Sequence, residues 1–136
     1  MNKKNHIISL EFIEELAKAQ NFIALLLHKC NVNSEICKEI HVVIDELCIN
    51  VFSYNDAGVR LDIEVNISYN EITLLFIDNG IPFNILEYNS EKVLDLLIEN
   101  EKIGGLGIYL VKHFADKLEY EYYDNKNHLS FYKLFI

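Results

Sequence analysis

The stretch from Ile36 to Tyr54 most constrains the fold, because its apolar residues recur at the spacing of one helix face. At about 100° of rotation per residue, these apolar residues form a single stripe. The members of the stripe are Ile36, Ile40, Val43, Leu47 and Val51. Glu46 and Asn50 lie four residues apart at its edge, whereas Asp45 points the opposite way. The helix must therefore pack on a core while keeping a carboxylate and a carboxamide at its border.

Glu46 and Asn50 admit two interpretations. A polar group half-turned toward a core costs free energy unless it gains a partner. Mg²⁺ takes oxygen ligands and is usually shared with substrate phosphates, so a metal-bound nucleotide is one such partner. The alternative is a pair of boundary residues satisfied by the backbone of a loop. For the pair alone, that alternative is the stronger of the two.

A second motif follows the apolar run Leu74 to Ile77, which has strand character and ends in Asp78-Asn79-Gly80. This tripeptide is a turn signal. Asp78 at a strand end can accept a hydrogen bond from an exocyclic amine, and Gly80 lets a flat ligand approach the backbone. An ordinary loop turn would use the same residues.

The third motif places Gly104, Gly105 and Gly107 at the start of an amphipathic helical pattern. Backbone N–H groups at a helix N-terminus, beside the positive end of the helix dipole, suit phosphate. The segment is not a P-loop, since no Gly-Lys-Ser/Thr follows, and it lacks the glycine spacing of a dinucleotide-binding fold. A flexible helix start without a ligand is the competing interpretation.

In this order and at these intervals, the three motifs resemble the N box and the two glycine boxes of the GHKL ATP-binding superfamily, which includes gyrase and the histidine kinases. The short chain, Pro82-Phe83 and the compact segment Ile103 to Ile108 resemble one branch, the bacterial anti-sigma factor serine/threonine kinases. The resemblance runs from about Ile36 to the C-terminus. It implies an α+β, two-layer fold in which helices cover one face of an antiparallel-rich mixed sheet. Residues 1–136 would form a single domain.

The resemblance also implies a role for each motif residue, with ATP and Mg²⁺ as the cofactors. Glu46 would be the catalytic general base and Asn50 the Mg²⁺ ligand. Asp78 would bind the adenine amine, and Gly80 would lie beneath the base. The phosphates would be held by a short glycine-rich segment, whose implied contacts are Lys102, Gly104, Gly105, Leu106 and Gly107.

Two positions depart from the pattern of this branch, and one assignment depends on a loose alignment. Tyr54 stands where many members have histidine, so no role of that histidine carries over. Lys102 stands where arginine is common, and a lysine fixes the geometry of a phosphate contact less tightly. The hydroxyl expected beside the adenine late in the fold would be Ser130.

Composition bounds the function classes. The chain has 136 residues, of which 51% are apolar and 24% charged, as expected for one globular domain with a core. A net charge of −9 argues against nucleic-acid binding, which needs a basic surface. No membrane span or signal peptide is visible. The odd number of cysteines, all in helical patterns, indicates reduced thiols, and we expect a cytoplasmic protein.

Hydrophobic periodicity predicts the elements in order. Strands are expected at His6–Leu10 and Leu61–Ile67, before Asp78, and at Leu118–Tyr123 and His128–Ile136, the last two joined by a turn at 124–127. Helices are expected at Glu11–Cys30, from a cap at Asn33 or Ser34 to Tyr54, and from Gly105 to about Lys117. The segment Asn84–Lys102, between the adenine and phosphate motifs, would be a short ATP lid.

We interpret the chain as an ATP-binding regulator of the anti-sigma type. It would transfer phosphate to a serine or threonine of a small anti-anti-sigma (STAS) protein. A sigma factor as a second partner and a homodimer are both compatible with this resemblance, whereas nucleic acid and membrane are not expected partners. Two alternatives stay open. One is a nucleotide-sensing module without efficient kinase activity. The other is a detached histidine-kinase catalytic domain, which usually has a longer lid and a phospho-accepting helix.

Overall fold

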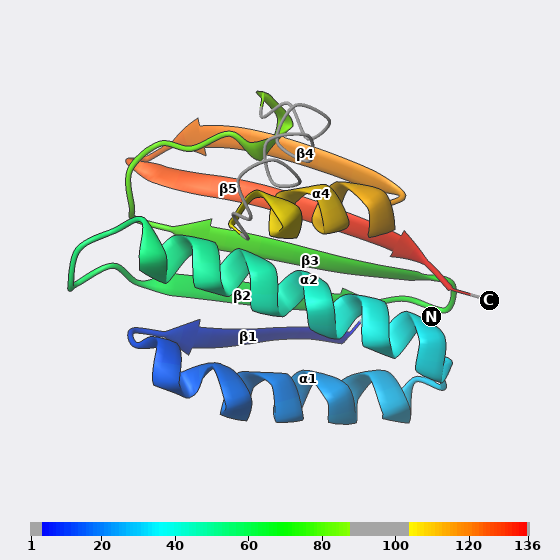
Figure 1. Cartoon of the computed structure of the whole chain (residues 1–136). Helices are drawn as coiled ribbons and strands as arrows, with labels where there is room; N and C mark the ends of the chain where they lie inside the picture. The colour runs from blue at the N-terminus through cyan, green and yellow to red at the C-terminus, as the bar shows by residue number, and fades with distance from the viewer. Residues whose placement is uncertain (1–3, 88–103, 136) are drawn as a thin grey trace.

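The structure, a computed structural model, describes residues 4–87 and 104–135, which form two layers (Figure 1). The strands are β1 (Lys4–Leu10), β2 (Leu61–Ile67), β3 (Glu71–Asp78), β4 (Lys117–Tyr123) and β5 (Lys126–Leu134). The helices are α1 (Leu16–Lys29), α2 (Ser34–Ser53) and α4 (Gly104–Phe114), with the 3-10 turns η1 (Ile13–Glu15) and η2 (Ile85–Glu87). The three helices cover one face of the sheet. The predicted α+β, two-layer arrangement is confirmed.

The strand order is β1-β2-β3-β5-β4, and every neighbouring pair is antiparallel. The expectation of a mixed sheet is therefore wrong for the described residues. The connection from β3 through α4 does produce a strand parallel to β3, namely β4. The final strand β5 inserts between these two and pairs with both, so β3 and β4 never meet.

Most predicted element bounds are confirmed within a few residues. Asn33 caps α2, since its side chain accepts a hydrogen bond from the Ile36 amide at 2.9 Å. The helix expected from Glu11 instead begins at Leu16 after a 3-10 turn. The reason is Glu15, whose carboxylate accepts from the amides of Glu11 and Phe12 at 2.8 and 3.0 Å.

The turn between β4 and β5 is shorter than expected. It consists of Asp124 and Asn125, both with positive φ (53° and 58°), as a two-residue hairpin of right-handed twist requires. Lys126 and Asn127, predicted in the turn, already belong to β5. Asn127 therefore lies within the sheet, next to β3, which matters for the site below.

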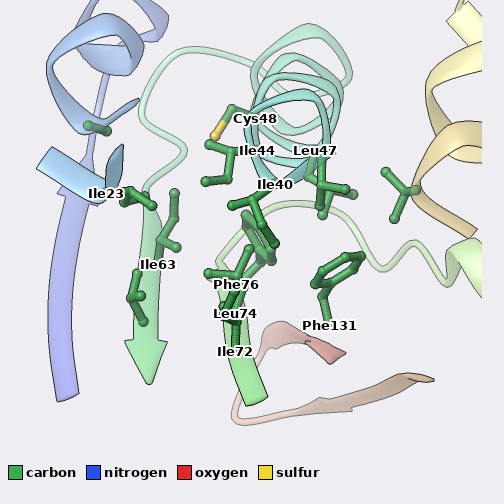
Figure 2. Packing of buried hydrophobic residues seen from close by; sticks show 14 of the residues in the cluster. Ile23, Ile40, Ile44, Leu47, Cys48, Ile63, Ile72, Leu74, Phe76 and Phe131 are labelled. Carbon is green, nitrogen blue, oxygen red and sulfur yellow. The ribbon is translucent and has the colours of Figure 1, made fainter. Parts of the chain in front are cut away.

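The core lies between α2 and the centre of the sheet (Figure 2). Alternate residues of β2 and β3 are buried. The apolar stripe of α2 is wider than predicted, because Ile44 and Cys48 are also fully buried. Burial, together with the nearby negative charge of Asp45, raises the pKa of the Cys48 thiol to about 12, so this thiol is a protonated packing group.

The proposed ATP lid falls largely outside the described residues, which include only Asn84 to Glu87 of it. Lys102 also falls outside them. Of the helices that are described, none combines the length and the apolar character needed to cross a membrane.

Candidate functional site

A cavity of about 300 Å³ opens between the C-terminal half of α2 and the sheet. Its walls are mostly apolar, and they come from α2, β3, the loop after β3, β4 and β5. Polar side chains reach it from the same elements, namely Asn50, Tyr54, Asn55, Asp78, Tyr120 and Asn127. A largely apolar cleft with a few convergent polar groups is the usual form of a small-molecule site.

Asp78 is the buried acid of this cavity. It is the last residue of β3 and only 8% of its surface is exposed. Its Oδ1 accepts hydrogen bonds from the Gly80 amide at 2.9 Å and from Asn127 Nδ2 at 3.0 Å. Burial raises the pKa of Asp78, and these two hydrogen bonds oppose the rise. Since both bonds end on Oδ1, Oδ2 is the oxygen left to accept from a ligand.

Gly80 also has a packing role that the sequence did not indicate. A Cβ placed on Gly80 would lie 2.5 Å from the Asn55 carboxamide. Asn55 fills this space because it donates to the Val51 carbonyl at 2.7 Å and accepts from the Ile81 amide at 2.8 Å. Glycine at position 80 therefore lets Asn55 tie the end of α2 to the loop after β3. Sequence reasoning missed Asn55, which resembled an ordinary turn residue.

Glu46 lies against the first turn of α4. A Cβ on Gly107 would stand 2.1 Å from Glu46 Oε2, so only glycine leaves room for the carboxylate at this point. Burial, and secondarily the charge of Asp45, raises the pKa of Glu46. Asp45 itself points away, as predicted, and accepts from Gln20 Nε2 at 2.9 Å. The helix thus separates its two adjacent acids.

Asn50 follows Glu46 by one helical turn and lines the cavity. Its Nδ2 is buried, and no described residue hydrogen-bonds to it. Because the amide nitrogen and oxygen are assigned from their surroundings, an orphaned amide means that either atom can face a ligand. A buried polar group of this kind costs about 1–3 kcal/mol until it gains a partner. Among the described residues that line the cavity, Asn50 is therefore one whose side-chain amide can still form a hydrogen bond with a ligand.

The first turn of α4 is built from Gly104, Gly105, Leu106 and Gly107. The first backbone N–H groups of a helix have no partner within it and lie at the positive end of the dipole. The first turn of α4 thus lies next to Glu46, with Asn50 one helical turn away on α2. Asn50 lines the cavity, and Glu46, one helical turn before it on α2, contacts the first turn of α4.

Comparison with known families agrees with this geometry. The sequence matches the histidine kinase-like ATPase domain over residues 12–133, which is most of the chain. The chain belongs to this family. As a histidine kinase-like ATPase domain, it is an ATP-binding domain, and the resemblance to the GHKL superfamily is confirmed at that level. A comparison with curated proteins gives no match.

Solved structures show the same fold. The catalytic domain of histidine kinase ThkA matches in several nucleotide-free crystal forms. One gives a TM-score of 0.52 at 15% identity, with 95% of this chain and 97% of that chain covered. A second gives a TM-score of 0.53 at the same identity and coverage. At this identity the likeness establishes the arrangement of helices and strands of the ATPase domain.

The metal expected for such a domain can be tested against the residues present. Among residues 4–87 and 104–135, no three His, Cys, Asp or Glu side chains gather into a ready metal site. The orphaned amide of Asn50 nevertheless fits a hard cation, which is commonly held by one or two protein oxygens and by substrate phosphates. The described part of the ATPase domain thus suits a cation that arrives with its nucleotide.

The assignment of Ser130 needs correction. In β5, Ser130 pairs with Leu75 and Glu119 and lies on the sheet face opposite the cavity. Asn127 is the residue of β5 that reaches Asp78. The sequence did hold a signal for Asn127: it is separated by even numbers of residues from Leu129 and Phe131, and alternate residues of a strand share a face. Tyr54 does line the cavity, where its ring lies 6.2 Å from that of Phe83.

Asp78→Asn should weaken ATP binding and shift the preference toward GTP. The Gly80 amide and Asn127 Nδ2 require an acceptor, so the new amide oxygen must face them and its NH₂ must face the cavity. An NH₂ group facing the cavity cannot accept from the adenine amine, but it can donate to the 6-oxo group of guanine. Loss of a charged hydrogen bond typically costs about 1.5–3 kcal/mol. Calorimetry with both nucleotides measures the change.

The matched control is Asp62→Asn, since Asp62 lies on β2 outside the cavity and bonds Ser9 of β1 and Arg60, which precedes β2. It should bind ATP as the wild type does. An unchanged ATP-to-GTP ratio in Asp78→Asn would show that Asp78 serves the turn alone.

Proposed function

We propose that this domain is an ATP- and Mg²⁺-dependent protein kinase that phosphorylates a serine or threonine of a small anti-anti-sigma (STAS) protein. The observation that carries the proposal is the Glu46 carboxylate seated against Gly107 in the first turn of α4. That place puts a base beside the backbone donors that suit phosphate. The resemblance of the three motifs to the anti-sigma branch supports this partner class.

Each group at the site has a defined task in this proposal. Asp78 Oδ2 accepts the adenine amine, and the apolar walls contact the base. The first amides of α4 bind phosphate oxygens. Asn50 would hold the Mg²⁺, which neutralises phosphate charge during phosphoryl transfer. Positioning and electrostatics supply most of the catalysis in this class of reaction.

Glu46 favours a hydroxyl as the acceptor of the phosphate. A serine or threonine hydroxyl must lose its proton as it attacks, whereas a neutral imidazole has a free lone pair on one nitrogen. A base works best when its pKa is close to the working pH, and burial moves the pKa of Glu46 upward in that direction. The site therefore suits a hydroxyl substrate better than one that needs no deprotonation.

The test is phosphate transfer in a purified system. The protein is incubated with ATP, Mg²⁺ and each STAS protein from the same cell, and phosphosites are mapped by mass spectrometry. We expect one acid-stable phosphate on a serine or threonine. Acid-labile phosphate on a histidine would support a detached histidine-kinase domain. ATP-dependent binding of a STAS protein without transfer would support a nucleotide-sensing module. A sigma factor can be added to the same mixture to test the second partner.

Asn50→Ala should remove the Mg²⁺ dependence of ATP binding while the fold persists. Even outer-shell partners of a metal are worth roughly 10–100-fold in metal affinity, so loss of a direct ligand should exceed tenfold. The melting temperature should stay level or rise, because the substitution removes a buried amide nitrogen that has no described partner. Calorimetry with and without Mg²⁺, and a thermal melt, provide the two measurements.

Asn55→Ala is the matched control, since Asn55 lines the same cavity but is bonded to Val51 and Ile81. It should lower the melting temperature and keep the Mg²⁺ dependence. The opposite pattern in the two variants would overturn the ligand assignment.

A further inference from the structure

The carboxamide of Asn127 is the most highly connected polar group of the cavity. It is 5% exposed and makes four hydrogen bonds. Its Oδ1 accepts from the Phe83 amide at 3.0 Å and from the Tyr120 hydroxyl. Its Nδ2 donates to the Ile81 carbonyl at 2.8 Å and to Asp78 Oδ1 at 3.0 Å. These bonds use the full capacity of an asparagine amide, so Asn127 has none left for a ligand.

The partners also fix which way the amide points. The Phe83 amide can only donate and the Ile81 carbonyl can only accept, so Oδ1 and Nδ2 of Asn127 cannot exchange places. Nδ2 must therefore face Asp78. With the Gly80 amide on the same oxygen, Asp78 is held by two donors from one side. Its second oxygen is thereby presented as a bare acceptor.

We propose that Asn127 is a positioning residue that makes this cavity select a purine bearing a 6-amino group. The inference rests on the proposed ATP function and deepens it. A 6-amino group donates to the oxygen of Asp78 that Asn127 leaves unoccupied. A 6-oxo group would bring a second acceptor against it. The same amide ties the Ile81–Phe83 segment, which lines the cavity, to β5.

The charge state of Asp78 also depends on Asn127, and it affects the same selectivity for a 6-amino group. Burial raises the pKa of Asp78, while Asn127, Gly80 and the charge of His128 lower it. The titratable side chains around Asp78 are Tyr54 from α2, Tyr120 from β4 and His128 from β5. Without the Asn127 donor, Asp78 would keep its proton to higher pH. A protonated carboxyl can donate to a 6-oxo group, so selectivity would weaken.

The experiment compares ATP with purine riboside triphosphate, which lacks only the 6-amino group. Their affinity ratio, measured by calorimetry, reports the contact to Asp78. In the wild type it should be roughly ten- to a hundredfold, the value of a charged hydrogen bond. Asn127→Leu should bring the ratio close to one. Tyr120→Phe removes one bond to Asn127 Oδ1 but leaves Nδ2 on Asp78, so the ratio should remain high.

A purely structural role would lower the affinity for both nucleotides and leave the ratio unchanged. A wild-type ratio in folded Asn127→Leu therefore overturns the inference while the proposed function stands. A wild-type protein that binds neither nucleotide overturns the proposed function and this inference together. A wild-type ratio near one shows that Asp78 does not contact the 6-amino group, and it also overturns the inference.

Asn127→Asp provides a second variant, which keeps the acceptor for Phe83 and Tyr120, in case Asn127→Leu does not fold. At mildly alkaline pH the introduced carboxylate repels Asp78, and the ratio should collapse. At mildly acidic pH the two acids share a proton, the donor is restored and the ratio should recover. The wild type should show the opposite trend, because Asp78 itself becomes protonated. Repeating both series with His128→Gln removes the effect of the His128 charge on Asp78. Parallel pH trends in the two proteins would overturn the proposal.

Discussion

Glu46→Gln should abolish phosphoryl transfer and leave ATP binding intact. The amide keeps the shape of the carboxylate against Gly107 but cannot take a proton from the attacking hydroxyl. Loss of a general base typically costs about 10²–10⁴-fold in rate. Single-turnover transfer to the STAS partner measures the rate, and calorimetry measures ATP binding.

The direction in which the melting temperature of Glu46→Gln changes distinguishes loss of the base from general destabilisation of the fold. Burial raises the pKa of Glu46, so the folded protein binds this proton more tightly than the unfolded chain does. The ionised carboxylate therefore costs stability as pH rises through the interval between its ordinary and raised pKa. Glutamine removes that cost, and the melting temperature at neutral pH should stay level or rise. Wild-type transfer should also decline as pH falls through the raised pKa.

Asp45→Asn is the paired control. Asp45 precedes Glu46 but faces Gln20 and His41, away from α4. Asparagine keeps an oxygen that can accept from Gln20 Nε2, so transfer should stay within a few-fold of the wild type. Full activity in Glu46→Gln, or a comparable loss in Asp45→Asn, would contradict the assignment of the base.

Local periodicity explains why most of the fold could be predicted. The stripe on α2 and the alternation in β2 depend only on residues within each element, and burial follows them directly. The glycine motif was visible for a related reason, since its residues are contiguous and open a helix. Such features can be recognised from residues that lie close together in the sequence.

The missed residues depend on contacts between distant segments. Asn127 belongs to β5 because the positive φ of Asp124 and Asn125 closes a two-residue turn, whereas the predicted four-residue turn left Asn127 outside the strand. Asn55 likewise gains its role only from the approach of Gly80, 25 residues later in the chain. Alternation in β5 indicates which face Asn127 lies on, but neither of these contacts between distant segments can be read from one element alone.

Gly107→Ala should slow phosphoryl transfer by displacing the Glu46 carboxylate, while the base itself remains present. A Cβ at this site would stand 2.1 Å from Oε2, 2.9 Å from Cδ and 3.1 Å from Cβ of Glu46. The flexible carboxylate end must move aside, whereas the helix itself gains about 1 kcal/mol from alanine over glycine. We therefore expect a folded protein in which the base is displaced. Misplacement by about 1 Å can cost a hundredfold, so transfer should fall at least that far.

The double variant Glu46→Gln/Gly107→Ala gives the decisive comparison. If alanine acts by displacing Glu46, it should cost little once the base is already lost, and the two effects on rate should be strongly non-additive. If the rate loss in the double variant equals the product of the two single losses, Gly107 acts through the phosphate contacts of α4 instead. Wild-type transfer in Gly107→Ala alone would show that α4 does not fix the base. The cycle thus tests whether the contact between α2 and α4 is what assembles the catalytic site.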